Sequence, residues 1–454
     1  MMQLFQVAQW TQGQHQGSDV ALTGVSTDTR TLKPGDLFVA LKGDRFDGHA
    51  FLAQAKAKGA RAALVSEPTE VFEHTVLVKD TTQALGLLAQ QWAAQWQLRT
   101  VGITGNSGKT SVKEMIAALL HEDENSCLAT EGNFNNHIGV PLTLLRARAE
   151  NTYGVYELGA NHQGEIAWTA SLVAPQVGVI TNVTGAHLAG FGSLEGIAQA
   201  KAELIPAVAA QQGVVVLNQE GGFFEYFQQV AEAHQVTVVR VSTEDTSAHY
   251  LAKHIQLGTH HSHFICQGPD TEVEITLGLP GKHQISNALQ AIAVAREFNV
   301  SWAHIQHTLA HLSGVPGRLQ LIPCGEGLII DDTYNANPGS VAAALDFLHT
   351  QPTPHMFVFG GIGELGEATD EAHRQLGTYA AELGIDGMIT VGELPMAAAE
   401  AFGEGALQCP TTDDVAPFAA PVLQQGGTVL VKGSRSTAME NVVAALLAHQ
   451  QEAH

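Results

Sequence analysis

A short loop of small residues, placed between two apolar stretches, has the residue types that bind phosphate. The loop runs from Gly105 to Gly108 and is followed by Lys109 and Thr110. Backbone N–H groups of such a loop and the N-terminus of the next helix face an anion, and the lysine reaches the outer phosphates. The threonine hydroxyl can be a ligand of Mg²⁺. The sequence therefore predicts a triphosphate site that consists of Gly105, Asn106, Ser107, Gly108, Lys109, Thr110 and Ser111.

The phosphate-loop pattern is incomplete at its first position. The full form, G-x-x-x-x-G-K-[ST], would need glycine at 103, where the sequence has Ile103. The flanking stretches support the shorter form T-G-x-x-G-K-T, because residues 101–104 are predicted to be a buried strand and a helical apolar period follows. The alternative is a glycine loop that precedes a lysine by chance. The apolar period consists of Val112, Met115, Ile116, Leu119 and Leu120.

Further polar side chains follow predicted strands in the same part of the chain. Glu157 and His187 each come at or after the end of an apolar strand, where ligands bind in open α/β sheets. Thr110 and Glu157 are oxygen ligands suited to Mg²⁺, and His187 is available for a second ion. Lys201, in a predicted helix, is a cation. It must therefore act on phosphate or carry a modification that makes it anionic.

Three polar clusters in the last third of the chain also adjoin predicted strands. They are Gly317-Arg318, residues 331–338 (D-D-T-Y-N-A-N-P) and residues 432–435 (K-G-S-R). Each alone has an ordinary explanation, since Asn-Pro marks a turn and Gly-Ser-Arg fits a helix cap. Together, three such clusters facing a triphosphate site predict a cleft between domains.

The alternation of strands and helices predicts an α/β protein of several domains. A length of 454 residues corresponds to about three domains. We predict a small N-terminal α/β domain at 1–97, a central P-loop ATPase domain with a parallel sheet at 98–313 and a C-terminal Rossmann-like domain at 314–454. The central domain is expected to carry a small antiparallel excursion at 250–280.

Composition restricts the partners and the compartment. A formal net charge of −23 argues against nucleic acid and anionic membranes as partners. The four cysteines are far apart and form no C-x-x-C pair, which fits a reducing cytoplasm. The N-terminus has no basic, apolar leader, and no run of 18 apolar residues occurs, so we predict a cytoplasmic protein without a membrane span.

Two other patterns carry less specific chemistry. His260, His261 and His263 could form a metal cluster, but alternating strand faces and a turn explain them better, since no cysteine or carboxylate lies nearby. Residues 361–366 match the dinucleotide pattern G-x-G-x-x-G, but no acidic residue is well placed at the end of the next strand. A glycine-rich turn beside a cleft accounts for them better than NAD binding does.

Taken as a set, the motifs resemble those of the Mur ligases of peptidoglycan synthesis. They are T-G-N-S-G-K-T, Y-E-L-G-A-N-H, T-N-V-T-G-A-H-L, A-K-A-E-L, G-R-L and D-D-T-Y-N-A-N-P. The shortened phosphate loop is the form that this family uses, and the resemblance covers all three units. The N-terminal S-T-D-T-R and G-D-R-F-D-G-H and the C-terminal K-G-S-R resemble the member that adds a D-alanyl-D-alanine dipeptide.

The resemblance implies an ATP-dependent reaction. ATP would phosphorylate the terminal carboxylate of UDP-N-acetylmuramoyl-tripeptide, and the amine of D-alanyl-D-alanine would attack the acyl phosphate. Thr110 and Glu157 would hold a first Mg²⁺, and His187 with a carbamylated Lys201 would hold a second. Carbamylation turns the Lys201 amine into a carboxylate-like ligand. We expect the enzyme to be a monomer.

The resemblance also assigns contacts by position. Lys109 would bind the β- and γ-phosphates, while Asn287, Arg318 and Asp332 would contact adenosine or ribose. The γ-phosphate and the acceptor carboxylate would lie near Asn135 and Asn136, the dipeptide near Tyr334, Asn335, Lys432, Ser434 and Arg435, and the uridine diphosphate near Ser26, Thr29, Arg30, Gly43, Phe46, Asp47, Gly48 and His49.

The sequence departs from the family pattern at two places and leaves alternatives open. Gln219 stands where a carboxylate is expected, and residues 360–366 read G-G-I-G-E-L-G rather than L-G-x-M-x-E-L-G. The competing hypotheses are a sibling ligase that adds one amino acid, a P-loop ATPase without ligation, and a dehydrogenase built on the third domain. The sequence does not distinguish meso-diaminopimelate from L-lysine as the third peptide residue.

Overall fold

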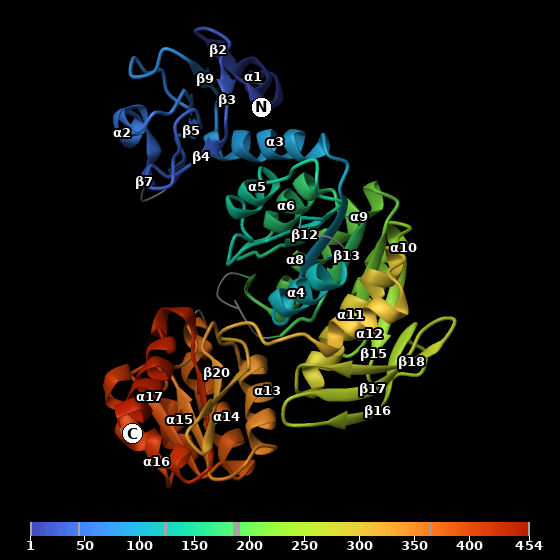
Figure 1. Ribbon diagram of the computed structural model, residues 1–454, viewed down its shortest axis with the longest axis vertical. Coiled ribbons are helices and arrows are strands. Elements are labelled where there is room, and N and C mark those ends of the chain that lie inside the picture. Colours follow the sequence, from blue (N-terminus) through green and yellow to red (C-terminus); the bar gives the residue numbers. More distant parts are fainter. Residues whose placement is uncertain (1, 44–45, 122–124, 185–190, 364, 453–454) are drawn as a thin grey trace.

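The computed structural model describes residues 2–43, 46–121, 125–184, 191–363 and 365–452. They form three successive α/β units, each built around its own main sheet. Figure 1 shows the N-terminal unit at one end of the molecule, the central unit in the middle and the C-terminal unit at the other end. The α/β architecture in three parts that the sequence predicted is confirmed.

The N-terminal unit is a five-stranded sheet of order β2-β9-β8-β5-β4, in which β2 is antiparallel to β9 and the other pairs are parallel. Residues 48–57 form a 3₁₀ turn continued by a short helix, and a longer helix begins at Thr81. Asp80 caps that helix, because its carboxylate accepts hydrogen bonds from the N–H groups of Thr82 and Gln83. The elements are β1 (Met2–Gln3), α1 (Leu4–Thr11), β2 (Gln14–Gln16), β3 (Ala21–Leu22), β4 (Val25–Ser26), β5 (Leu37–Val39), β6 (Lys42–Gly43), β7 (Phe46–Asp47), η1 (Gly48–Phe51), α2 (Leu52–Ala57), β8 (Ala62–Val65), β9 (Thr75–Leu77) and α3 (Thr81–Ala94).

The central unit is a nine-stranded sheet of order β11-β12-β10-β13-β14-β15-β16-β17-β18. The strands from β11 to β16 pair in parallel, and β16, β17 and β18 pair antiparallel, so the predicted excursion at 250–280 is present. The elements are β10 (Arg99–Thr104), α4 (Lys109–Leu119), β11 (Cys127–Ala129), α5 (Gly139–Leu144), β12 (Tyr153–Glu157), α6 (Glu165–Val173), β13 (Val177–Ile180), α8 (Leu194–Ala202), α9 (Leu204–Ala210), β14 (Val214–Asn218), α10 (Phe224–Ala233), β15 (Thr237–Ser242), β16 (Tyr250–Leu257), β17 (Ser262–Gln267), β18 (Glu272–Leu277), α11 (Lys282–Glu297) and α12 (Trp302–Ala310).

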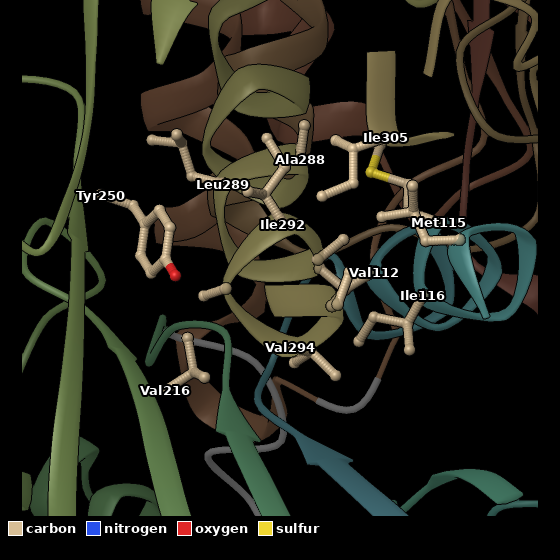
Figure 2. Packing of buried hydrophobic residues seen from close by; sticks show 14 of the residues in the cluster. Val112, Met115, Ile116, Val216, Tyr250, Ala288, Leu289, Ile292, Val294 and Ile305 are labelled. Carbon is tan, nitrogen blue, oxygen red and sulfur yellow. The ribbon is translucent and has the colours of Figure 1, made fainter. Parts of the chain in front are cut away.

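The helix that follows the phosphate loop is anchored in the largest core of the central unit. Figure 2 shows side chains of α4 packed against α11, with strand residues on the other side of α11. Alanines fill much of α11, which lets α4 and the sheet approach it closely. The N-terminus of α4 is therefore held by a dry core. Figure 2 labels Val112, Met115, Ile116, Val216, Tyr250, Ala288, Leu289, Ile292, Val294 and Ile305.

The C-terminal unit is a six-stranded sheet of order β19-β20-β24-β21-β22-β23, parallel except for the pair β19 and β20. β19 and β23 form the two edges of this sheet. The elements are β19 (Gln320–Cys324), β20 (Gly327–Asp332), α13 (Pro338–His349), β21 (His355–Phe359), η2 (Gly366–Ala368), α14 (Thr369–Glu382), β22 (Gly387–Val391), α15 (Met396–Phe402), β23 (Ala406–Cys409), η3 (Thr412–Asp414), α16 (Ala416–Gln424), β24 (Thr428–Lys432), η4 (Arg435–Thr437) and α17 (Glu440–Glu452).

Across the described ranges, no helix is both long enough and apolar enough to span a membrane.

The histidines at 260–263 lie at and before β17. His263 lies on β17, opposite Thr276 of β18, and its Nδ1 is 3.0 Å from the threonine hydroxyl. The described histidines, cysteines and carboxylates nowhere gather in a group of three suited to a metal. His260 and His261 lie in the turn between β16 and β17 and His263 lies on β17, in agreement with the explanation by a turn and alternating strand faces.

Candidate functional site

The phosphate loop connects β10 to α4 with two glycines at positive φ. Gly105 has φ 142°, and a Cβ atom there would come 1.9 Å from the Thr181 hydroxyl. Gly108 has φ 79° and precedes the first residue of α4, and a Cβ atom there would come 2.7 Å from Asn287 Oδ1. Both positions therefore require glycine. Asn287 lies beside the loop, as predicted for a residue of the nucleotide site, and donates to Gln284 Oε1.

The amine of Lys109 is folded back on its own loop. Its Nζ donates to the carbonyl oxygens of Gly105 and Asn106 at 2.9 and 3.0 Å. Burial lowers the pKa of this amine, Glu157 opposes that shift, and Arg318 adds to it. Two cationic side chains thus share a site with one carboxylate, and an anionic ligand in the loop would be stabilised there.

Glu157 is held in place at both carboxylate oxygens. The Thr110 hydroxyl donates to Oε2 at 2.7 Å, and Asn135 Nδ2 donates to Oε1 at 2.9 Å. The sheet explains the proximity, because β10 and β12 pair in parallel with Ile103 opposite Glu157. The carboxylate is 3% exposed. Thr110 and Glu157 thus form the pair of oxygen groups that Mg²⁺ prefers, next to a phosphate loop.

Two side chains reach the phosphate loop from the C-terminal unit. Arg318 Nη2 donates to the Thr110 hydroxyl at 2.8 Å, and Asn337 Nδ2 donates to the Ser107 hydroxyl at 2.9 Å. Among the described residues, Nε of Arg318 is buried without a hydrogen-bond partner. The C-terminal unit is therefore in direct contact with the loop, in agreement with a site between domains.

Sequence reasoning missed three residues that shape the loop. Thr181 and Asn182 follow β13 and hold the main chain of Ser107, and the third is Asn337. Thr181 and Asn182 belong to the T-N-V-T stretch at a strand end, and Asn337 belongs to N-A-N-P. Those positions were visible as polar strand-end residues, but their partners depend on how β10 and β13 pair and how two units meet.

Lys201 is almost completely buried in the last turn of α8. The residue is 2% exposed. Burial, together with the positive charge of Lys109, lowers the pKa of its amine to about 7. Glu203 and Glu165 oppose the shift. Burial therefore favours the uncharged form of this amine. His187, expected beside it, lies outside the described residues.

Asp332 and Lys432 form a buried ion pair. The pairing of β20 with β24 sets the two residues opposite one another, and Lys432 Nζ lies 2.5 Å from Asp332 Oδ2. Lys432 also donates to the Asn335 carbonyl at 2.9 Å, and Asp332 Oδ1 accepts from Leu319 N at 3.1 Å. Lys432 was expected near the dipeptide and Asp332 near the nucleotide. In the structure the two side chains bond to each other instead, and the side chains of Lys432 and Asp332 are 2% and 11% exposed, respectively.

Lys432→Met is expected to lower the free energy of unfolding by about 3 kcal/mol, because it leaves the buried Asp332 carboxylate without its cation. Urea unfolding monitored by circular dichroism measures the change. Lys432→Met combined with Asp332→Asn should recover most of the loss, since neither charge then remains buried. A loss below about 1 kcal/mol in the single variant would contradict this role of the pair.

The remaining residues expected near the dipeptide lie in the C-terminal unit, in the segments that follow β20 and β24. The Arg318 guanidinium lies 4.1 Å from the centre of the Tyr334 ring, and Arg435 lies 6.0 Å from the same ring. Ser434 Oγ accepts from Gly363 N at 2.7 Å. Asn335 Oδ1 accepts from the N–H of Ala336, which shapes the turn before α13. The Tyr334 ring therefore lies near both arginines, just beyond the carboxyl end of β20.

The glycine turn at 361–366 is occupied by contacts within the C-terminal unit. Ile362 N donates to His373 Nε2 at 2.8 Å, and Gly363 N donates to Ser434. In a dinucleotide site such N–H groups face a pyrophosphate. Their use by side chains agrees with the prediction of a structural turn rather than an NAD site.

Residues expected near uridine diphosphate lie in two loops of the N-terminal unit, far along the molecule from α4 in Figure 1. In the first loop, the Ser26 hydroxyl donates to the carbonyl of Asp28, and the Thr29 hydroxyl donates to Gln54 Oε1. Arg30 Nη2 lies 2.6 Å from Asp28 Oδ2. The hydrogen bonds of Arg30 lower the pKa of Asp28 to about 2. The Arg30 side chain is 87% exposed, so it presents a cation at the surface.

The second loop contains a stacked aromatic pair and an oriented histidine. Phe46 is exposed and stacks on Phe51 with 5.4 Å between ring centres. His49 Nε2 accepts from Ser66 N, so its Nδ1 carries the proton and donates to Asp47 at 2.7 Å. A Cβ atom on Gly48 would come 2.8 Å from the backbone of Leu41, whereas Gly43 has open space.

Asn136 and Gln219 have structural partners. Asn136 Oδ1 accepts from the N–H groups of Ile138 and Gly139, which begins α5. Gln219 Nε2 donates to Asp245 Oδ2 at 2.7 Å. Ser111 lies in the first turn of α4. Of the expected site, the structure therefore brings together the loop, Glu157, Asn135, Asn287 and Arg318 most directly.

Three family models match successive parts of the chain. They are the Mur ligase family, catalytic domain, at residues 21–93, the Mur ligase middle domain at 103–295 and the Mur ligase, glutamate ligase domain, at 317–435. The chain is 44% identical to the UDP-N-acetylmuramoyl-tripeptide--D-alanyl-D-alanine ligase of Escherichia coli K12, over 98% of both chains.

Solved structures agree with this relationship. A crystal structure of MurF from Acinetobacter baumannii superposes with a TM-score of 0.91 at 36% identity, over 98% of both chains. The MurF ligase of Thermotoga maritima in complex with ADP gives a TM-score of 0.86 at 27% identity, over 95% of this chain and 98% of that one. Sequence identity over nearly the full length and the three matching models lead to one conclusion: the chain is a member of the Mur ligase family.

Proposed function

We propose that this chain is an ATP-dependent ligase that joins D-alanyl-D-alanine to UDP-N-acetylmuramoyl-tripeptide, as its relatives' names state for them. The contact of Arg318 and Asn337 with the phosphate loop is the observation that carries the proposal. A nucleotide in that loop would lie where the central and C-terminal units meet. A carboxylate and an amine brought by the other units could then react beside the γ-phosphate.

The loop from Gly105 to Ser111 is the proposed binding site of the ATP phosphates. When a nucleotide binds, the Lys109 amine would break its hydrogen bonds to the two carbonyls and bond to the β- and γ-phosphates. The buried cation would then have an anionic partner. Asn287, Arg318 and Asp332 are proposed on the adenosine side. The ADP complex of the Thermotoga maritima relative supports a nucleotide of this kind.

The residues around the loop fit a magnesium ion. Thr110 and Glu157 would hold it, and a second ion would be held by His187 and a carbamylated Lys201. When bound, Mg²⁺ neutralises phosphate charge during transfer. Arg318 donates a hydrogen bond to the Thr110 hydroxyl, and this bond would have to break for the oxygen to bind the ion. A neutral amine reacts with CO₂ to form a carbamate and release a proton, and the pKa of Lys201 near 7 supplies such an amine.

The proposed reaction needs positioning more than covalent assistance. An oxygen of the tripeptide carboxylate attacks the γ-phosphorus and ADP leaves. The dipeptide amine then attacks the acyl carbon, phosphate leaves and the nitrogen loses a proton. Asn135 and Asn136 are proposed near the acceptor carboxylate, and the dipeptide is proposed near Tyr334, Asn335, Lys432, Ser434 and Arg435.

The N-terminal loops are proposed to bind the uridine diphosphate. Arg30 presents an exposed cation for the diphosphate, and the loop with Phe46 and His49 offers an aromatic face and an oriented imidazole. We propose domain limits of 1–97, 98–313 and 314–454, and a monomer that works in the cytoplasm. All four cysteines are free, which supports a reducing compartment.

Phosphate release assayed against a panel of UDP-muramyl peptides tests the function. We expect release that requires both a UDP-N-acetylmuramoyl-tripeptide and D-alanyl-D-alanine, because the acyl phosphate forms on one and is consumed by the other. Tripeptides ending in meso-diaminopimelate and in L-lysine should be compared. Release with neither substrate would indicate an ATPase without ligation, and release with a single amino acid would indicate a sibling ligase.

A further inference from the structure

The side chain of Asn337 bonds in two directions at the start of α13. Its Oδ1 accepts from Ser340 N at 2.9 Å, and its Nδ2 donates to Ser107 Oγ at 2.9 Å. A backbone N–H can only donate, so the contact with Ser340 fixes which end of the amide is oxygen. The amide nitrogen therefore faces Ser107, and the Ser107 oxygen must accept.

This contact determines what the Ser107 hydroxyl can do. Its oxygen accepts from Asn337, so its own proton remains available to donate to an anion in the loop. The main chain of Ser107 is already fixed, since its N–H donates to Asn182 Oδ1 at 2.9 Å and its carbonyl accepts from the Thr181 hydroxyl at 2.6 Å. The hydroxyl is thus an oriented donor on a rigid loop.

The start of α13 also packs closely on the central unit. A Cβ atom on Gly339 would come 3.2 Å from the Thr184 methyl group, so the two surfaces are already in contact. Asn337 therefore links the start of α13 to the phosphate loop and also caps that helix.

We propose that Asn337 is a positioning residue for the nucleotide. By holding the Ser107 oxygen, it directs the Ser107 O–H at the bound phosphates and keeps the C-terminal unit in register with them. The consequence for turnover rests on the proposed function, whereas the consequence for nucleotide affinity does not require it.

The simpler explanation is that Asn337 only caps α13, and Asn337→Ser separates the two roles. Serine is an equally good N-cap, so its oxygen can accept from Ser340 N. Its side chain is one bond shorter and has no amide donor for Ser107. Ser301→Ala is the matched control, because Ser301 caps α12 through His304 N and belongs to no part of the proposed site.

The experiment is a double-mutant cycle with Asn337→Ser and Ser107→Ala. The affinity for a fluorescent ADP analogue and kcat/KM are measured together with Tm. Asn337→Ser should weaken ADP binding and kcat/KM by about fivefold to tenfold, the effect of losing one hydrogen bond between neutral groups, here from Asn337 to Ser107. In the Ser107→Ala background it should have no further effect, and Tm should stay unchanged.

Independent effects of the two substitutions, or an Asn337→Ser protein with unchanged ADP affinity, would overturn the proposal. A loss of Tm alone, as expected for Ser301→Ala, would reduce Asn337 to a cap. If no UDP-muramyl peptide supports turnover, the proposed function fails, and the cycle on ADP affinity still decides the role of Asn337.

Discussion

Lys109→Ala is expected to lower kcat by about 10³-fold or more, because phosphoryl transfer depends on cations that neutralise the charge of the transferring group. The protein should remain folded. Within the described residues, Lys109 donates hydrogen bonds to the carbonyls of Gly105 and Asn106, and burial lowers its pKa, so holding its charge costs stability rather than adding to it. Phosphate release and Tm measure the two effects.

Lys253→Ala is a suitable control for Lys109→Ala. Lys253 pairs with Glu272 on the antiparallel strands, at 2.8 Å and 35% side-chain exposure. Its loss should leave turnover unchanged, as for most surface ion pairs. A Lys109→Ala enzyme that keeps more than about a tenth of the wild-type kcat would remove Lys109 from the phosphate site.

Lys201→Ala is expected to lower kcat by about 10²- to 10³-fold and to be partly rescued by formate or acetate. The variant lacks the amine that would become a carbamate, and a short carboxylate can replace the missing ligand. Stripping CO₂ from wild-type enzyme should lower activity in the same direction. Kinetics at rising formate concentration, with Mg²⁺ held constant, measure the rescue.

Lys113→Ala controls for the loss of a buried lysine. Lys113 is 2% exposed and donates to the Thr130 carbonyl at 2.8 Å, so its removal should reduce stability without rescue by carboxylates. Equal activity in Lys201→Ala and wild-type enzyme would exclude Lys201 from the metal site. Equal rescue of Lys201→Ala and Lys113→Ala by carboxylates would also exclude Lys201 from the metal site.

The pKa of Lys201 adds a pH dependence to this prediction. Its value in the folded protein is about 7, below the usual 10.5, because burial disfavours the charged amine. The folded protein therefore carries the full cost of that charge below about pH 7, and the cost is relieved as pH rises from 7 toward 10.5. The same shift means that carbamate formation, which uses the neutral amine, should decline below pH 7. Lys201→Ala removes both dependences and should not unfold the protein.

Local sequence patterns predicted much of the candidate phosphate site. The glycines at 105 and 108 are needed because their backbones take positive φ beside other side chains, and a helix begins directly after them. Glu157 was recognisable as a carboxylate at a strand end, and parallel pairing of β10 with β12 brings it to Thr110. These features follow from the immediate chain and from the geometry of parallel sheets, so the sequence alone could predict them.

Other assignments depended on partners far away in the chain. Lys432 was expected to be available for a substrate, yet the pairing of β20 with β24 places Asp332 against it. Residues 361–366 matched a dinucleotide pattern, yet His373 and Ser434 use two of the N–H groups. A motif shows which groups are present, but it does not show which of them are already paired.

The sequence by itself determined the α/β class, the phosphate loop and the resemblance to Mur ligases, because each depends on residues close together in the chain. The tertiary structure alone decided that Arg318 and Asn337 meet Thr110 and Ser107 across more than 200 positions of sequence. It also decided that Lys201 is buried near Lys109, where its pKa falls to about 7. Hydrogen bonds and charge interactions act through space, so only the packing of the units establishes them.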